Sequence, residues 1–268
     1  MMTNIIDIDI ISLAVGYLLL IAPMAIILLK RVPIFSDAVM AIIRMTVQLI
    51  FVGFYLQVVF DLNKPWLNLA WVILMVLVAD VSIIRGCRLT IRKFALPLFC
   101  ALTVGTIAPV LVFTIPILRL QNWMDAQYVI PLAGMVLGNC LRADIVGLKD
   151  FYESIIKNEK AYFQSLVQGA DQQEALAPYF RDAVQAALLP TTASMATIGL
   201  VALPGMMTGV ILAGASPATA IKYQIAIMIA IFSGTAITVF LAVRLSISYS
   251  FSKYGILDRK VFATPPGT

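Results

Sequence analysis

Met206 and Met207 are adjacent, and their thioethers could hold a transition metal. Met135 and Asn139, four residues apart in an earlier apolar stretch, add a thioether and an amide. Thioethers suit soft or transiently held metals, although methionine also commonly fills irregular space in a core. A Pro-Gly pair directly precedes Met206, and broken backbone at membrane depth tends to line a cavity. These residues are therefore candidates for a substrate pathway, with Met206 and Met207 as candidate metal ligands.

Charged and amide side chains inside other apolar stretches are further candidates. Arg44 and Gln48 are four residues apart and so share one helix face. Polar groups within a membrane usually mark function, but an arginine about two turns from a helix end can also snorkel to the interface. Asp80 is too short to reach water, so it predicts a partner, Arg44 or Arg85, or a cation site.

Several chemistries are excluded by residue patterns that the sequence lacks. It contains no histidine, and its three cysteines show no Cys-x-x-Cys spacing, so a zinc site is not indicated. No Gly-Lys pair occurs, so the chain cannot form the phosphate cradle Gly-x-x-x-x-Gly-Lys-Ser/Thr. Gly-x-Ser-x-Gly and His-Glu-x-x-His are also missing. We expect no catalytic residue and no cofactor bound by this chain, and any ATP hydrolysis must occur on a separate subunit.

The elements that position these side chains are predicted to be membrane-spanning helices. Of 268 residues, 61% are hydrophobic and only 12% are charged, which is far from the balance of a soluble protein. Apolar runs long enough to span a bilayer must be helical, because lipid cannot satisfy free backbone groups. We predict an all-α, polytopic integral membrane protein, a single domain over 1–268, with about seven spans at 8–29, 37–60, 66–84, 94–118, 127–148, 190–213 and 222–244.

The window 190–213 is the one most open to another interpretation, because it contains two prolines and three glycines. It could be a broken or re-entrant segment, which would reduce the number of spans to six and move the carboxyl terminus outside. The prolines of the window 94–118 predict a kinked helix there.

Basic residues are distributed unevenly over the predicted loops. With the amino terminus outside, only Lys64, Arg119 and Lys222 fall on the outer side, and most other bases fall in the cytoplasm. This asymmetry predicts a multi-pass protein of the cell (inner) membrane with a cytoplasmic carboxyl terminus. Basic and aromatic residues do not interleave on a polar face, so we expect no nucleic-acid partner.

The longest polar stretch, 149–189, predicts a cytoplasmic helical hairpin. Two helical patterns meet at Gly169-Ala170-Asp171, where glycine suits a helix end and aspartate suits the next N-cap. The segment could be an amphipathic connector lying on the membrane. It could instead couple the chain to an ATPase by docking into a groove on it.

This loop resembles that of ATP-binding-cassette permeases, in which a Gly-Ala turn precedes a helix that reaches a proline. The corresponding residues are Gln168, Gly169, Ala170, Asp171 and Pro190. The runs LPGMMTG at 203–209 and AIKYQI at 220–225, with VIPLAGMVLGN at 129–139, are similar to the FetB-type family of iron-export permeases and plant relatives implicated in aluminium tolerance. The family often carries an acidic residue and a lysine where this chain has Ala193 and Ala196.

The resemblance implies a permease subunit that works as a homodimer with two copies of a separate nucleotide-binding subunit, which binds the ATP. The implied substrate is iron, moved outward. The alternative is a self-sufficient secondary transporter or channel for a small solute.

Overall fold

The computed structural model describes residues 9–201, 203–252 and 254–262, and these residues are predominantly helical. The helices are α1 Ile10–Tyr17, η1 Leu18–Leu20, α2 Ile21–Leu29, α3 Phe35–Leu62, α4 Pro65–Gly86, α5 Ile91–Val112, η2 Phe113–Ile117, α6 Ala126–Lys157, α7 Glu159–Val167, α8 Gln172–Thr197, α9 Gly205–Leu212, α10 Pro217–Ser250 and η3 Arg259–Val261. Within the described ranges, β-structure is limited to isolated bridges, such as Leu89–Phe262 and Phe251–Leu257. The predicted all-α class is confirmed.

Six helices are long and apolar enough to cross a membrane: 11–29, 35–62, 65–86, 91–117, 126–157 and 217–250. Each matches one of the predicted windows. The window 190–213 does not form one continuous span, because α8 ends at Thr197 and α9 begins only at Gly205, so the alternative of a broken segment is confirmed. The helix α6 is longer than its window and runs nine residues beyond 148, to Lys157, into the segment that was assigned to the hairpin.

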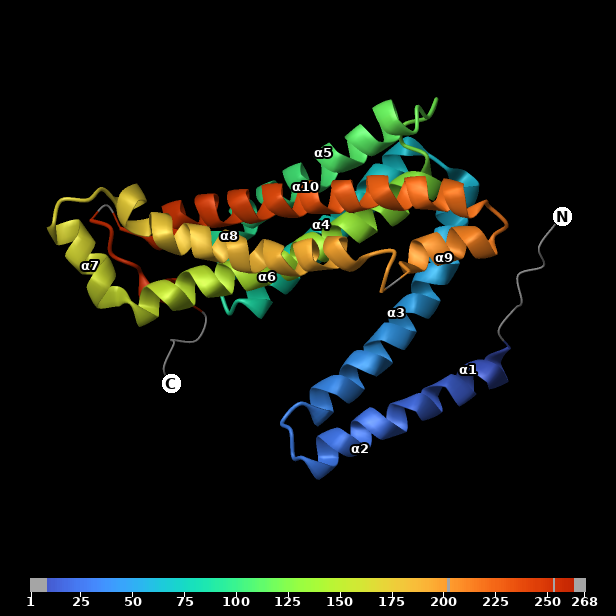
Figure 1. Cartoon of the computed structure of the whole chain (residues 1–268), viewed down its shortest axis with the longest axis horizontal. Helices are drawn as coiled ribbons and strands as arrows, with labels where there is room; N and C mark the ends of the chain where they lie inside the picture. Colours follow the sequence, from blue (N-terminus) through green and yellow to red (C-terminus); the bar gives the residue numbers. More distant parts are fainter. Residues whose placement is uncertain (1–8, 202, 253, 263–268) are drawn as a thin grey trace.

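The core lies between α4, α5, α6 and α10, and α8 packs along α6 and α10 (Figure 1). α5 and α10 approach most closely at two glycines. A Cβ atom added to Gly234 would lie 2.7 Å from the Gly105 carbonyl oxygen and 2.7 Å from a Val136 methyl carbon. Small residues allow helix backbones to approach in this way, so this crossing fixes the two central helices against each other.

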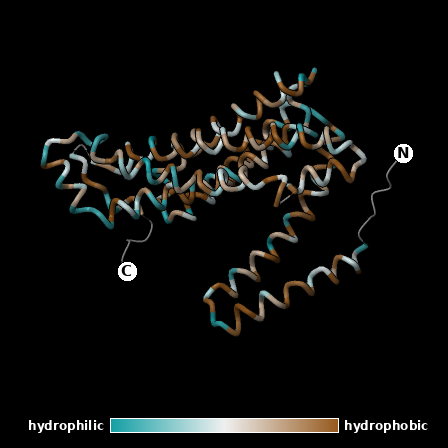
Figure 2. The backbone as a smooth tube through the Cα atoms, viewed as in Figure 1, coloured by the Kyte–Doolittle hydropathy of each residue, from teal (hydrophilic) through white to brown (hydrophobic). Residues whose placement is uncertain are grey.

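The bundle has two ends, and hydrogen bonds tie each of them together. At one end, called here the far end, the Asn63 amide oxygen accepts a hydrogen bond from the Ala126 N–H at 3.0 Å, which joins the α3–α4 turn to the start of α6. At the other, the hairpin end, the chain after α10 contacts α5 through Lys93 and Asp258 at 2.9 Å. It contacts α7 through Arg259 and Glu159 at 2.8 Å and through the Tyr162 hydroxyl, which donates to the Gly255 carbonyl at 2.8 Å. Figure 2 shows hydrophilic residues gathered around this end.

The chain connects these ends repeatedly, and α8 and α9 together make one of the passes. They follow each other from the hairpin end to the far end, where α10 begins (Figure 1). The break in window 190–213 therefore does not reverse the direction of α10.

The helices α1, α2 and α3 diverge from the bundle (Figure 1). Only the last part of α3 packs on it, where Val59 is buried and Tyr55 stacks on Trp71 with ring centroids 4.1 Å apart. None of the apolar stretch of the first two candidate spans is buried within the chain. Their large apolar side chains are left for lipid or for another protein.

Candidate functional site

The interruption between α8 and α9 is the structural feature around which the candidate site forms. Ile198 ends α8 in an extended conformation, and Gly199 has a φ of 86°, which favours glycine. Pro204 is the N-cap of α9. Pro190, in contrast, lies inside α8, so the break is caused at Gly199 and not at that proline.

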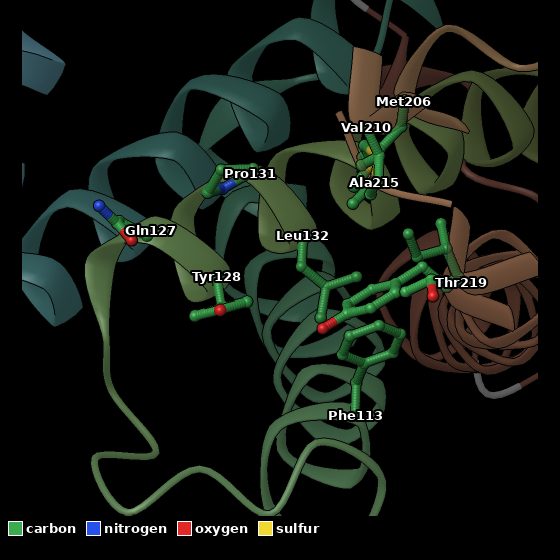
Figure 3. Close-up of a pocket in the computed structure, with 12 residues that line it drawn as sticks. Phe113, Gln127, Tyr128, Pro131, Leu132, Met206, Val210, Ala215 and Thr219 are labelled. Atoms are coloured by element: carbon green, nitrogen blue, oxygen red, sulfur yellow. The ribbon is translucent and has the colours of Figure 1, made fainter. Parts of the chain in front are cut away.

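One cavity of about 360 Å³ lies between α6, α9 and α10 and is lined by both Met135 and Met206 (Figure 3). Figure 3 shows Met206 and Val210 entering from α9, and Leu132 from α6 approaching Phe113 and Thr219. The lining is mostly apolar, with hydroxyl and amide groups at its edges. Two of the predicted thioether donors are thus brought to one cavity from helices far apart in the sequence.

Met207 faces a different cavity, of about 400 Å³, on the other side of α9. Met195 of α8 and Met228 and Gln224 of α10 line it as well. Gln224 is only 8% exposed, and its amide oxygen has no hydrogen-bond partner among the described residues. The structure therefore separates Met206 from Met207, and it places Met207 among two further thioethers and a free amide oxygen that the sequence analysis did not select.

A third cavity, of about 420 Å³, adjoins the second, because Ile198 and Met228 line both. Its polar side chains are Asn139, Arg142, Thr191 and Ser194. The Arg142 guanidinium donates to the Asn139 amide oxygen at 3.2 Å, and the Asn139 amide donates to the Met135 carbonyl at 2.8 Å. A guanidinium beside hydroxyl groups suits a carboxylate or phosphate oxygen, so this part of the site can bind an anionic group.

Arg142 and Asp144 are residues that the sequence analysis missed. Asp144 is 1% exposed, and both of its carboxylate oxygens lack a hydrogen-bond partner in the described parts of the chain. The sequence alone could have identified both residues, because their charges interrupt the apolar window 127–148 and charged residues within a span are functional candidates by default.

Asp80 is buried in α4, but its predicted pairing with Arg44 or Arg85 is wrong. The ion pairs found among the described residues are Lys93–Asp258 and Arg259–Glu159, and Asp80 Oδ1 has no hydrogen-bond partner there. Arg44 cannot reach it because α3 diverges from the bundle.

Arg44 and Gln48 lie on the exposed surface of α3, outside the three cavities. Of the predicted pathway residues, Met135, Asn139, Met206 and Met207 therefore line the three cavities near the break. Arg44, Gln48 and Asp80 lie outside these cavities.

The metal donors that line the three cavities at the α8–α9 break are thioethers, amides and hydroxyls. The described residues contain no cluster of three or more His, Cys, Asp or Glu side chains that could hold an ion. Burial raises the pKa of the Cys87 thiol to about 12, so it stays protonated at neutral pH and is a poor metal ligand. Thioethers and amides at the α8–α9 break are the remaining candidates.

The turn between α7 and α8 lies at the hairpin end. Gln168 ends α7, and Gly169 has a φ of 97°. Asp171 caps α8, because its carboxylate accepts from the Glu174 N–H at 2.7 Å while the Glu174 carboxylate accepts from the Asp171 N–H at 3.0 Å. This reciprocal pair fixes the corner of Gln168, Gly169, Ala170 and Asp171, in which Ala170 is half-buried and the other three residues are exposed.

Comparison with known proteins supplies the family. The chain is 31% identical to the Probable iron export permease protein FetB of Escherichia coli (strain K12) over 86% of this chain and 88% of that protein. It is 35% identical to UPF0014 membrane protein slr1647 of Synechocystis over 69% and 71%, and 32% identical to Protein ALUMINUM SENSITIVE 3 of Arabidopsis thaliana over 72% and 69%. No solved structure matches. The model of the Uncharacterised protein family (UPF0014) matches residues 10–251, and this multi-pass membrane protein therefore belongs to the UPF0014 family.

Proposed function

We propose that this chain is the permease subunit of an ATP-binding-cassette transporter and that it exports a metal ion, with iron as the first candidate. The observation that carries the proposal is the group of cavities around the α8–α9 break, where thioether and amide donors meet within the bundle. The similarity to a protein named as a probable iron export permease supports the choice of iron. The adjoining cavity at Arg142 suits a carboxylate or phosphate ligand that travels with the metal.

The energy for export comes from a partner subunit in this proposal. The sequence has no Gly-Lys pair and so no phosphate cradle of its own. The corner Gln168–Asp171 supports docking to a nucleotide-binding subunit on the cytoplasmic side, because it is exposed and fixed by the capping box. ATP binds to that subunit.

The active assembly contains two copies of this chain. The first two candidate spans expose their apolar faces and also carry Arg44 and Gln48, which are poorly suited to contact lipid alone. A second copy would cover this surface and give the polar side chains a protein environment.

Transport by reconstituted protein tests the proposal. The full chain is purified with and without a co-expressed ATP-binding-cassette ATPase and placed in vesicles, and Fe(II) movement is measured with ATP, without ATP and with a proton gradient. We expect transport only when both the ATPase and ATP are present. Transport by the chain alone, driven by a proton gradient, would establish the self-sufficient transporter instead.

A further inference from the structure

A groove of about 770 Å³ runs between the first turns of α8 and the last turns of α10. It is the largest of the described cavities and is separate from those at the α8–α9 break. Leu176, Phe180 and Arg181 line it from α8, and Phe240 and Arg244 line it from α10. We call it the hairpin-end groove.

The charge of this groove is positive and unbalanced. Arg181 and Arg244 come from facing helices, both are exposed, and no acidic side chain is among the lining residues. Neither arginine belongs to the two ion pairs found in the described parts of the chain. The hydroxyls of Ser248 and Ser252 add neutral donors. This set matches a phosphate diester, which offers oxygen acceptors and a single negative charge.

The rest of the groove is apolar and aromatic. Leu176 is buried at its base, and the rings of Phe180 and Phe240 meet edge to face with centroids 5.6 Å apart and an interplanar angle of 83°. Phe240 is 51% exposed although it lies in a membrane-spanning helix. A ligand that pairs an anionic head with a hydrocarbon tail would cover both kinds of surface.

The position along α10 agrees with such a ligand. Measured along α10 from Lys222 at 1.5 Å per residue, Arg244 lies at about 33 Å and Phe240 at about 27 Å, beyond and within the hydrocarbon thickness of about 30 Å. Arg244 therefore reaches headgroup depth at the hairpin end, while Phe240 lies one turn deeper, beside acyl chains.

We propose that the hairpin-end groove binds an anionic phospholipid, with its phosphate between Arg181 and Arg244 and an acyl chain against Phe180 and Phe240. Basic pockets between spanning helices are known sites for anionic headgroups. Gln172, the first residue of α8 after the α7–α8 corner, lines the groove, so a bound lipid would stabilise the start of α8. The proposal does not depend on the transported substrate or on the ATPase.

Native mass spectrometry of the purified full chain tests this site. The protein is titrated with phosphatidylglycerol or with phosphatidylcholine of the same acyl chains. We expect selective retention of phosphatidylglycerol. The double variant Arg181→Gln with Arg244→Gln should lower the affinity for this lipid about twenty-five-fold, since each base near a membrane surface contributes about fivefold. The matched control, Arg85→Gln with Arg92→Gln, removes two exposed bases from the same end but outside the groove and should retain the lipid.

The double variant Arg181→Lys with Arg244→Lys is the control for correct folding. It keeps both charges and should retain most of the lipid. Equal retention of both lipids, or unchanged retention of phosphatidylglycerol by the double glutamine variant, would overturn the proposal. Displacement of the lipid by millimolar inorganic phosphate would show that the groove recognises a free anion. If the double glutamine variant lost a co-expressed ATPase while keeping the lipid, the groove would be a protein-docking surface instead.

Discussion

At the scale of single residues, the adjacent methionines Met206 and Met207 have different surroundings. Met206 shares its cavity with Met135, whereas Met207 shares another with Met195 and Met228. Helical geometry explains the separation, because neighbouring residues on a helix point about 100° apart. The two cavities can therefore be tested independently.

We predict that Met135→Leu with Met206→Leu lowers metal export by about fivefold, the effect of losing a contact of about 1 kcal/mol. Folding should be preserved, since leucine and methionine are close in volume. ATP-dependent Fe(II) transport in vesicles measures the effect. Met195→Leu with Met207→Leu tests the second cavity, and Met40→Leu, exposed on α3, is the control. Normal transport by both double variants would remove the methionines from the pathway.

The types of these side chains were visible in the sequence, but their grouping was not. Met135 and Met206 line one cavity because α9 packs on α10 after the break, and no local pattern specifies that arrangement. The pairing of Asp80 with Arg44 failed for the same reason, because it required the first part of α3, which carries Arg44, to lie against α4. Arg142, by contrast, could have been selected from the sequence alone as a charge within an apolar window.

At the scale of elements, hydropathy predicted every continuous span, because the length and apolar composition of such a helix are local properties. The break in window 190–213 was left open because prolines within a membrane helix can be accommodated, as Pro190 is in α8. What ends α8 is the backbone conformation at Gly199, which depends on how α9 turns back onto the bundle.

The α7–α8 corner depends on the left-handed conformation of Gly169, and its N–H donates to the Leu166 carbonyl at 3.1 Å. Gly169→Pro imposes a φ near −65° and removes this donor. We predict that the variant inserts normally but loses co-purification with the ATPase. Gln172→Pro is the matched control, because the first residue of a helix tolerates proline and the extended Asp171 before it does too. Co-purification by both variants would contradict a coupling role for the corner.

The close contact between α5 and α10 leads to a prediction about the stability of the bundle. Gly234→Ala should destabilise the bundle by about 1–3 kcal/mol, because the new methyl would overlap the Gly105 carbonyl and Val136 in a well-packed core. Thermal unfolding in detergent measures the loss. Gly53→Ala on α3 makes the same change where nothing lies within 4 Å and should have little effect. Equal stability of the two variants would mean that α5 and α10 are not in close contact.

At the scale of the whole molecule, the two ends of the bundle differ in charge. The far end carries Lys64 and Arg119 in its turns and Lys222 near the start of α10. The hairpin end carries many more bases, namely Arg85, Arg88, Arg92, Lys93, Lys149, Lys157, Lys160, Arg181, Arg244 and Arg259. Cytoplasmic loops are enriched in such residues. The α7–α8 corner should therefore face the cytoplasm, where a nucleotide-binding subunit could reach it.

Labelling of single cysteines with a membrane-impermeant maleimide tests this orientation. Cys87 and Cys140 are buried, so only the exposed Cys100 needs to be replaced, by alanine, in the background. We predict that Gln121→Cys, in the α5–α6 loop, reacts in intact cells, because the far end faces outward. Gln168→Cys should react only after the membrane is permeabilised. The reverse pattern would place the corner outside the cell, where no ATPase could dock, and the proposed function would have to be rejected.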